Sequence, residues 1–178
     1  MIIQTDRTIL RPWADTDADA LGTMLGDPEV MVDYPAPLSR EISDGKLRRY
    51  REVYDRLGYT RWLLERRDGA FLGYVGIMPI FDDHPLAPGV EIGWRLMRAA
   101  WGHGYVTEAA TAALQDGFER MGFDEVLCYT LPTNLRSQAV MSRLGLTREA
   151  GRDFVTQTVD GPWNGWTWAA RPGWGRSL

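Results

Sequence analysis

The chain has 178 residues and a formal net charge of −4, with 44% hydrophobic and 25% charged residues. These values exclude a disordered or collagen-like chain and predict a single domain over residues 1–178. No apolar run approaches the roughly 20 residues of a membrane helix, and the N-terminus has no signal-peptide pattern, so we expect a cytoplasmic protein without a membrane partner.

Residues 1–80 are expected to form a strand, two helices and a hairpin. Asp15 or Thr16 is the expected cap of the first helix, and Ser39 that of the second, which should stop at Gly58. An Asp-Gly turn favours the hairpin. In chain order the predicted elements are a strand at 2–13, helices at 15–25 and 39–57, and strands at 60–65 and 71–77.

Residues 81–178 are expected to continue with alternating strands and helices and to end in a second hairpin. Apolar residues at helical spacing predict the helices, and the Asp160-Gly161 pair predicts the last turn. In chain order the predicted elements are a strand at 90–96, a helix at 106–121, a strand at 125–130, a helix at 136–144, and strands at 154–158 and 163–169. The order of all elements predicts an α/β fold of the mixed α+β kind.

Several function classes are excluded by composition. The net charge is negative and basic runs are no longer than two residues, so we expect no nucleic-acid partner. A single cysteine, Cys128, excludes an internal disulfide, and with only two histidines we expect no metal. Lys46 is the only lysine among the 20 basic residues. We assign this bias towards arginine no function.

The strongest local feature is a strand, a glycine-rich turn and a helix between residues 90 and 121. Gly102 and Gly104 allow consecutive N–H groups to point into one concavity, and the following helix adds free N–H donors and its positive dipole end. This is an anion site suited to phosphate or pyrophosphate. It lacks the P-loop signature, and Thr107 stands where a dinucleotide fingerprint needs its last glycine. A plain strand–helix turn remains the alternative.

Two stretches around this turn resemble motif A of the GNAT superfamily of N-acetyltransferases: Val-Glu-Ile-Gly-Trp-Arg-Leu at 90–96 and Trp-Gly-His-Gly-Tyr-Val-Thr-Glu-Ala at 101–109. Residues 133–137, Val140 and residues 144–146 resemble motif B. The segments 6–13 and 160–163 are similar to the branch of ribosomal-protein N-terminal acetyltransferases. The resemblance implies a twisted, mostly antiparallel sheet of about seven strands, splayed in the middle, with about four helices on its faces.

The resemblance also implies acetyl-CoA as the cosubstrate. Backbone N–H groups near Trp94 and Leu96 would polarise the thioester carbonyl, and Arg98 would approach the CoA phosphates. The complete set of residues expected to bind CoA is Trp94, Arg95, Leu96, Arg98, Gly102, His103, Gly104, Tyr105, Val106, Thr107, Asn134 and Arg136.

Glu91 is the candidate general base. It shares one face of its predicted strand with Gly93 and Arg95, an unexpected choice for a core strand. The chemical demand on the base is modest when the acceptor is an α-amine, since the reference pKa of that group is about 7.7–8.0. The alternative is a structural glutamate paired with an arginine at the sheet edge.

Ser137 is the candidate general acid, because the resemblance implies that it lies near the sulfur, where it could protonate the leaving thiolate. Many members of the superfamily use a tyrosine one turn further on, where this chain has Met141, which has no proton to donate. Asn134 would bond the pantetheine arm, although a helix cap explains it equally well. Tyr34 and Trp163, together with Glu91, are the residues expected to meet the acceptor.

These features predict an acetyl-CoA-dependent N-acetyltransferase that moves the acetyl group directly to a primary amine. The acceptor would be a protein N-terminal α-amine or a small amine. The alternatives are a non-catalytic acyl-CoA-binding regulatory module on the same fold, and a nucleotide-phosphate binder. The tryptophan-rich C-terminal part leaves a homodimer open.

Overall fold

The computed structural model describes residues 1–158 and 161–174, and these form two compact units. Unit 1 comprises Met1–Gly76 and Gly93–Ala113, and unit 2 comprises Ile77–Ile92 and Leu114–Leu178. The boundaries fall inside two strands and one helix, so these three elements belong to both units. A single domain over the whole chain stays a prediction. Within the described residues, no helix is long and apolar enough to span a membrane.

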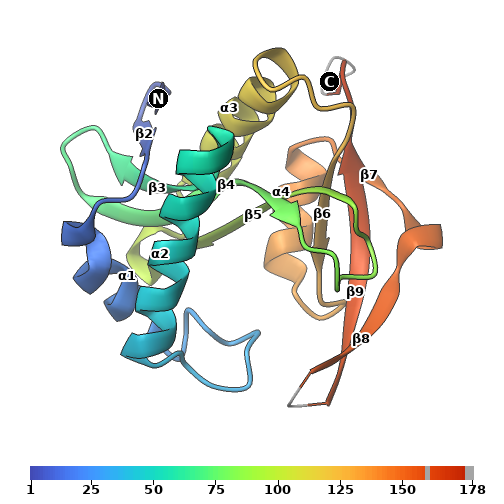
Figure 1. The fold of residues 1–178 in the computed structure, drawn as a ribbon, viewed down its shortest axis with the longest axis horizontal. Coiled ribbons are helices and arrows are strands. Elements are labelled where there is room, and N and C mark those ends of the chain that lie inside the picture. The colour runs from blue at the N-terminus through green and yellow to red at the C-terminus, as the bar shows by residue number, and fades with distance from the viewer. Residues whose placement is uncertain (159–160, 175–178) are drawn as a thin grey trace. The chain divides into compact units, whose positions relative to one another are not determined.

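Unit 1 contains an antiparallel run of strands with two helices that pack side by side, α1 and α2 (Figure 1). Pairing proceeds from β1 to β2, β3 and β4, with Leu10 opposite Leu64 and Leu63 opposite Tyr74. The elements that contribute are β1 (Ile3–Gln4), β2 (Thr8–Arg11), α1 (Ala18–Leu25), α2 (Arg40–Leu57), β3 (Arg61–Arg66), β4 (Phe71–Ile80), β5 (Gly89–Leu96) and α3 (Tyr105–Glu119).

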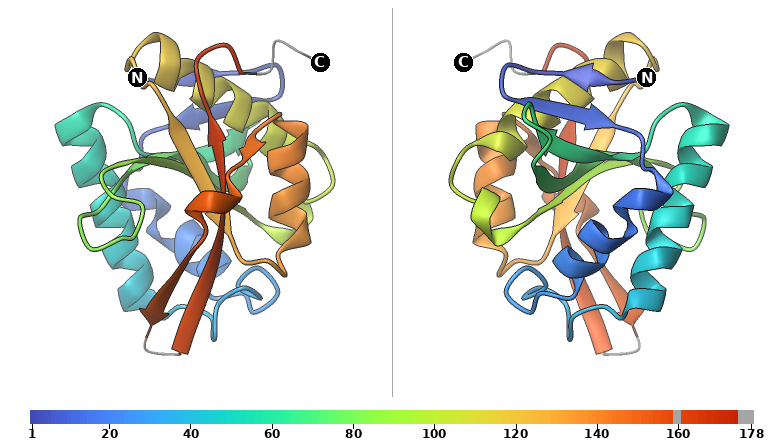
Figure 2. Two further views of the ribbon diagram at one scale, coloured as in Figure 1. Left: turned by 90° about the vertical axis from the view of Figure 1, so that its right-hand side faces the viewer. Right: turned by 90° about the vertical axis from the view of Figure 1, so that its left-hand side faces the viewer.

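Unit 2 is built around β9, which pairs with three other strands. The β8–β9 hairpin forms a long two-stranded ribbon, visible in both views of Figure 2. β6 pairs with β9 in antiparallel fashion and with β5 in parallel, where Glu91 lies opposite Leu127. The elements added here are β6 (Val126–Thr130), α4 (Leu135–Arg143), β7 (Thr147–Arg148), β8 (Phe154–Thr158) and β9 (Gly161–Ala170).

The predicted fold class is confirmed: the fold is mixed α/β, with an open, mostly antiparallel sheet and four α-helices in the described residues. The described residues form nine strands instead of about seven, because the strand expected at 2–13 is divided into β1 and β2 and because β7, two residues long, gives no alternation pattern in the sequence. The predicted Asp160 turn position lies outside the described residues.

The predicted limits of α2 are confirmed by its caps. The Ser39 hydroxyl accepts a hydrogen bond from the N–H of Ile42 at 3.3 Å, and Gly58 ends the helix in the left-handed conformation at φ 75°. Serine at the start and glycine at the end satisfy backbone groups that the helix itself leaves without partners. Local chemistry was therefore sufficient to place this helix.

Two predictions near the N-terminus are wrong. The strand expected at 2–13 is two short strands, because Thr5 and Thr8 close a turn between them through a 2.7 Å contact between their hydroxyls. Neither Asp15 nor Thr16 caps α1; both belong to a 3-10 turn, and Asp17 is the residue before the helix. The Asp17 carboxylate binds Arg11 at 2.8 Å instead of capping α1.

A glycine in β4 allows its close approach to β5. A Cβ atom at Gly73 would lie 2.1 Å from the backbone oxygen of Arg95 and 2.7 Å from the Cα of Leu96. Real Cβ atoms do not come this close to backbone, so only glycine fits here. The close contact fixes the path of the second half of β5, which carries several of the candidate CoA-binding residues.

Candidate functional site

The glycine turn before α3 has the left-handed backbone expected of it. Gly102 and Gly104 have φ values of 78° and 77°, and α3 begins directly afterwards at Tyr105. A Cβ atom at Gly102 would meet no other atom within 4 Å, so the space in front of this residue is open. The first turn of α3 adds N–H donors that have no partner within the helix. This arrangement is suited to hold a phosphate group.

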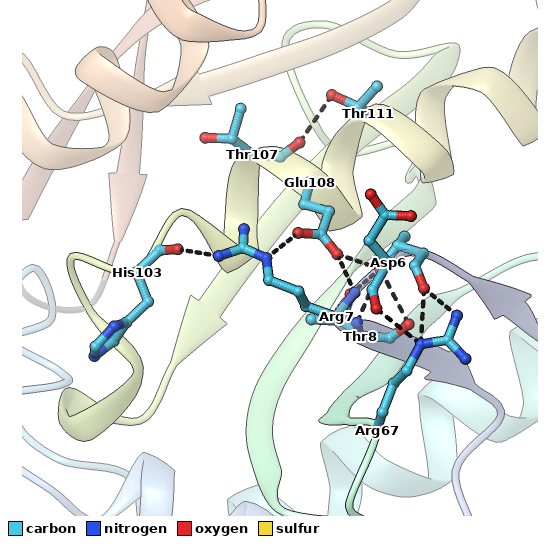
Figure 3. A network of polar contacts seen from close by, with 9 residues as sticks. Asp6, Arg7, Thr8, Arg67, His103, Thr107, Glu108 and Thr111 are labelled. Atoms are coloured by element: carbon cyan, nitrogen blue, oxygen red, sulfur yellow. Dashed lines mark hydrogen bonds and ion pairs between the residues drawn. The ribbon is translucent and has the colours of Figure 1, made fainter.

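The turn is held by a network of polar contacts from the segment between β1 and β2 (Figure 3). The guanidinium of Arg7 donates to Glu108 Oε2 at 2.6 Å and to the backbone oxygen of His103 at 2.9 Å. His103 lies between the two turn glycines. Arg7 therefore links the turn directly to the first turn of α3.

Glu108 is the centre of this network. Its Oε1 atom accepts hydrogen bonds from the Thr5 hydroxyl at 2.5 Å and from the Arg7 backbone N–H at 2.8 Å. Partial burial would raise the pKa of the Glu108 carboxyl, but the bonds from Thr5 and Arg7 and the charge of Arg7 outweigh it and lower that pKa. A carboxylate in the first turn is also favoured by the helix dipole. Glu108 belongs to the stretch that resembles motif A, but the sequence did not predict that it anchors the turn.

Glu91, the candidate base, is buried in β5 with 6% of its surface exposed. Glutamate is almost never buried without a partner, which keeps the structural alternative open. The backbone of Glu91 lies in unit 2, opposite Leu127 of β6. Its role as a base stays a prediction.

Arg95 and Arg98, both expected to bind CoA, have partners in the segment between α1 and α2. Arg95 forms two hydrogen bonds with Asp33, at 2.7 and 2.9 Å, and Arg98 forms an ion pair with Glu29. The Arg95 guanidinium also lies 5.0 Å from the centre of the Tyr34 ring. Arg95 thus positions the segment that carries Tyr34, a candidate acceptor residue.

The start of α4 brings Asn134 and Ser137 together in unit 2. Asn134 Oδ1 accepts a hydrogen bond from the backbone N–H of Ser137 at 3.1 Å, so Asn134 acts as the helix cap. Met141, one turn later, is 1% exposed and packs in the core. The cap accounts for Asn134 without CoA. In the first turn of the helix, Arg136 is exposed and Ser137 is half-buried.

The remaining predicted residues divide between the two units. Trp163 of β9 lies in an aromatic cluster of unit 2, with its ring centre 5.6 Å from that of Phe154 and 6.1 Å from that of Tyr129. Trp94 and Leu96 occupy β5 in unit 1, and Leu96 is buried. Tyr105, Val106 and Thr107 form the start of α3. The predicted CoA roles of all these residues stay predictions.

One group of charged residues was missed by sequence reasoning. Lys46 of α2, Arg61 of β3 and Arg95 of β5, all in unit 1, act electrostatically on Tyr74 of β4, and Arg61 Cζ lies 5.8 Å from the centre of the Tyr74 ring. We call these four residues the basic cluster. The only sequence signal was that Lys46 is the single lysine, because the four positions come from four separate elements.

Comparison with known proteins identifies the family of this fold. A family model described as "Acetyltransferase (GNAT) domain" matches residues 7–147. The curated protein "Uncharacterized protein YkkB" of Bacillus subtilis (strain 168) is 32% identical over 144 residues, which cover 80% of this chain and 83% of YkkB.

Solved structures share the same fold. An acetyltransferase of the GNAT family from Bacillus anthracis has a TM-score of 0.81 at 22% identity, covering 96% of this chain and 98% of that one. A structure titled as RimL, the ribosomal L7/L12 alpha-N-protein acetyltransferase, in complex with coenzyme A has a TM-score of 0.76 at 18% identity, covering 96% and 98%.

The Glu108 network generates a pH-dependent stability prediction. The folded-state pKa of Glu108 is lowered, so its contribution is complete above the unfolded-state pKa of about 4.3 and is lost as pH falls through the lower folded value. We expect Glu108→Gln to reduce the free energy of unfolding by on the order of 1 kcal/mol at pH 7, and by progressively less below about pH 4. Urea unfolding between pH 3 and pH 7 measures both effects.

Glu119→Gln, on the exposed last turn of the same helix, is the matched control and should stay within about 0.5 kcal/mol of the wild type at all pH values. A loss for Glu108→Gln that is equal at pH 3 and pH 7 would show that the carboxylate charge is not what the network uses.

Proposed function

The chain belongs to the GNAT family of acetyltransferases, and we propose that it transfers the acetyl group of acetyl-CoA directly to a primary amine of a small molecule or a protein N-terminus. The observation that carries this proposal is the left-handed Gly102–Gly104 turn at the start of α3, within the residues that the family model matches. Open space in front of Gly102 fits the close approach of a pyrophosphate.

The proposed reaction has one tetrahedral intermediate and no acyl-enzyme. The lone pair of the neutral amine forms a C–N bond with the thioester carbonyl carbon, and the C–S bond then breaks. The amine nitrogen loses one proton, and the CoA thiolate gains one. Backbone N–H groups of the second half of β5, near Trp94 and Leu96, would stabilise the oxyanion.

Glu91 and Ser137 are the proposed proton carriers. Glu91 would accept the proton of the amine, directly or through water, and Ser137 would protonate the thiolate. The near-complete burial of Glu91 and the position of Ser137 in the first turn of α4 are compatible with these roles. The finer assignment to the ribosomal-protein branch rests on the similarity of residues 6–13 and 160–163 alone.

The proposal is tested first by thiol release from acetyl-CoA with a panel of amines and with peptides of varied first residue. We expect amine-dependent thiol release in the wild type. In Gly102→Ala, acetyl-CoA affinity should fall at least about tenfold, because the new methyl group would occupy the phosphate position. Isothermal titration calorimetry measures the affinity.

The matched control is Gly69→Ala, in the turn between β3 and β4. Gly69 has a similar φ of 86° and equally open surroundings, so both variants carry the same backbone strain. Equal acetyl-CoA affinity in the two variants would contradict the pyrophosphate assignment. Acetyl-CoA binding without thiol release for any amine would favour the regulatory module.

Glu91→Gln should leave acetyl-CoA affinity nearly intact and reduce the transfer rate most at low pH. The base is needed most when the amine is protonated, and a higher pH supplies neutral amine without its help. Steady-state rates between pH 6 and pH 9 measure the effect. A variant that matches the wild type throughout this range would make Glu91 a structural residue.

Ser137→Ala should lower turnover more than acetyl-CoA affinity. General-acid catalysis typically contributes on the order of 10²–10⁴-fold, so a decrease of this size is expected if Ser137 protonates the thiolate. Ser142→Ala, exposed on the same helix, is the control for helix stability. A decrease below about threefold would mean that the thiolate leaves without an enzyme acid.

A further inference from the structure

The basic cluster places positive charge in unit 1 close to the candidate site. Lys46 and Tyr50 are one turn apart on α2, so they share a face of this helix. Tyr50 packs against Tyr74 of β4, with ring centres 5.7 Å apart. The same face of α2 therefore brings the only lysine of the chain towards the phenol ring at the centre of the cluster.

Arg61 extends the cluster to β5. Its guanidinium lies against Gly93, where an added Cβ atom would come within 2.7 Å of Arg61 Nη2, and its carbon atom Cζ is 5.8 Å from the centre of the Tyr74 ring. Gly93 directly precedes Trp94 and follows Glu91 by two positions in the same strand. The positive charge thus borders the strand on which we propose that the thioester is held.

Arg95 supplies the third cation and is 13% exposed in its side chain. Its partner is Asp33, so the charge of Arg95 is balanced within unit 1. In the part of the chain that the structure describes, Lys46 has no hydrogen bond or ion pair of its own.

The pKa of two members is shifted by the positive charges around them. Burial would raise the pKa of the Tyr74 hydroxyl, but the charges of Arg95, Arg61 and Lys46 outweigh it and lower that pKa. Burial lowers the pKa of Lys46, Tyr74 raises it, and the positive charges of Arg61 and Arg95 lower it further. The cluster therefore favours a negative charge near Tyr74 and disfavours the charged form of Lys46.

We propose that the basic cluster binds an anionic oxygen group, a carboxylate or a phosphate, carried by the acceptor amine. The acceptor is then a small amino acid or an aminoalkyl phosphate, with its anion at Lys46 and its amine directed to β5. This inference rests on the proposed transfer of acetyl to an amine and names the substrate class of that site.

A half-buried lysine among arginines is a poor choice for stability alone. Charged groups removed from water without a partner destabilise the folded state, and like charges add repulsion. Replacing Lys46 with an apolar residue of similar length should therefore leave thermal stability equal or higher. An anion-binding role is the function that would offset this loss of stability, because the ligand supplies the missing negative charge.

The experiment compares matched acceptors that differ only in charge: glycine with glycinamide, and phosphoethanolamine with ethanolamine. We measure kcat/KM by thiol release for the wild type, Lys46→Met and the control Arg48→Met. Arg48 is exposed on the same helix, so both variants remove one positive charge from α2. The ratio of variant to wild type within each pair cancels the intrinsic reactivity of the amines.

We expect Lys46→Met to lower the preference for at least one anionic acceptor over its neutral partner by about tenfold or more, mainly through KM. Arg48→Met should leave the ratio within about twofold. An effect confined to the glycine pair would identify a carboxylate as the bound group, and an effect confined to the phosphoethanolamine pair would identify a phosphate. The melting temperature of Lys46→Met should be equal to or above that of the wild type.

Two outcomes overturn the inference while the proposed function stands: a wild-type enzyme that prefers neutral amines or peptide N-termini, or an unchanged ratio in Lys46→Met. Calorimetry of the same acceptors with CoA-loaded enzyme gives a second readout that does not need turnover. Anion-dependent binding that Lys46→Met abolishes would support the site even when no thiol is released, and in that case only the proposed function fails.

Discussion

The Glu108 carboxylate is the point on which the arrangement of the candidate phosphate site depends. It accepts hydrogen bonds from Thr5 and from both the backbone and the side chain of Arg7, residues about a hundred positions earlier in the chain. Arg7 in turn donates to the carbonyl of His103 between the turn glycines. A left-handed glycine turn is flexible by itself, and this long-range anchor gives it one conformation.

A second constraint is that the basic residues differ in their carboxylate partners. A guanidinium holds a planar carboxylate through two bonds, and Arg95 does this with Asp33, which fixes the segment of Tyr34. Lys46 is a compact point charge without such a partner. Arg95 therefore has a structural role, whereas Lys46 is the cation that we propose meets the ligand. That distinction underlies the inferred class of acceptor.

The sequence predicted those parts of the fold that local chemistry controls. Ser39 and Gly58 delimit α2 because a hydroxyl and a left-handed glycine satisfy the ends of any helix. Prediction failed where contacts outside the helix decide where it begins. Neither Asp15 nor Thr16 caps α1, since both lie in a 3-10 turn. Arg11 and the N–H of Ala14 hold the carboxylate of Asp17, the residue before the helix. The two-residue strands β1 and β7 exist only through pairing with β2 and β9.

For the candidate site, the sequence by itself determined the family resemblance and the glycine turn. Two glycines spaced as Gly102 and Gly104 are before a helix allow a left-handed turn, and this is a local property of the backbone. The tertiary structure alone decided how the charges combine. Arg95 was predicted to bind CoA, yet its partners are in a segment more than sixty residues away. Lys46, Arg61 and Tyr74 come from three elements, and no spacing in the sequence relates them. Electrostatic interactions act through space, so only the folded chain could bring the charges of Lys46 and Arg61 to act on Tyr74.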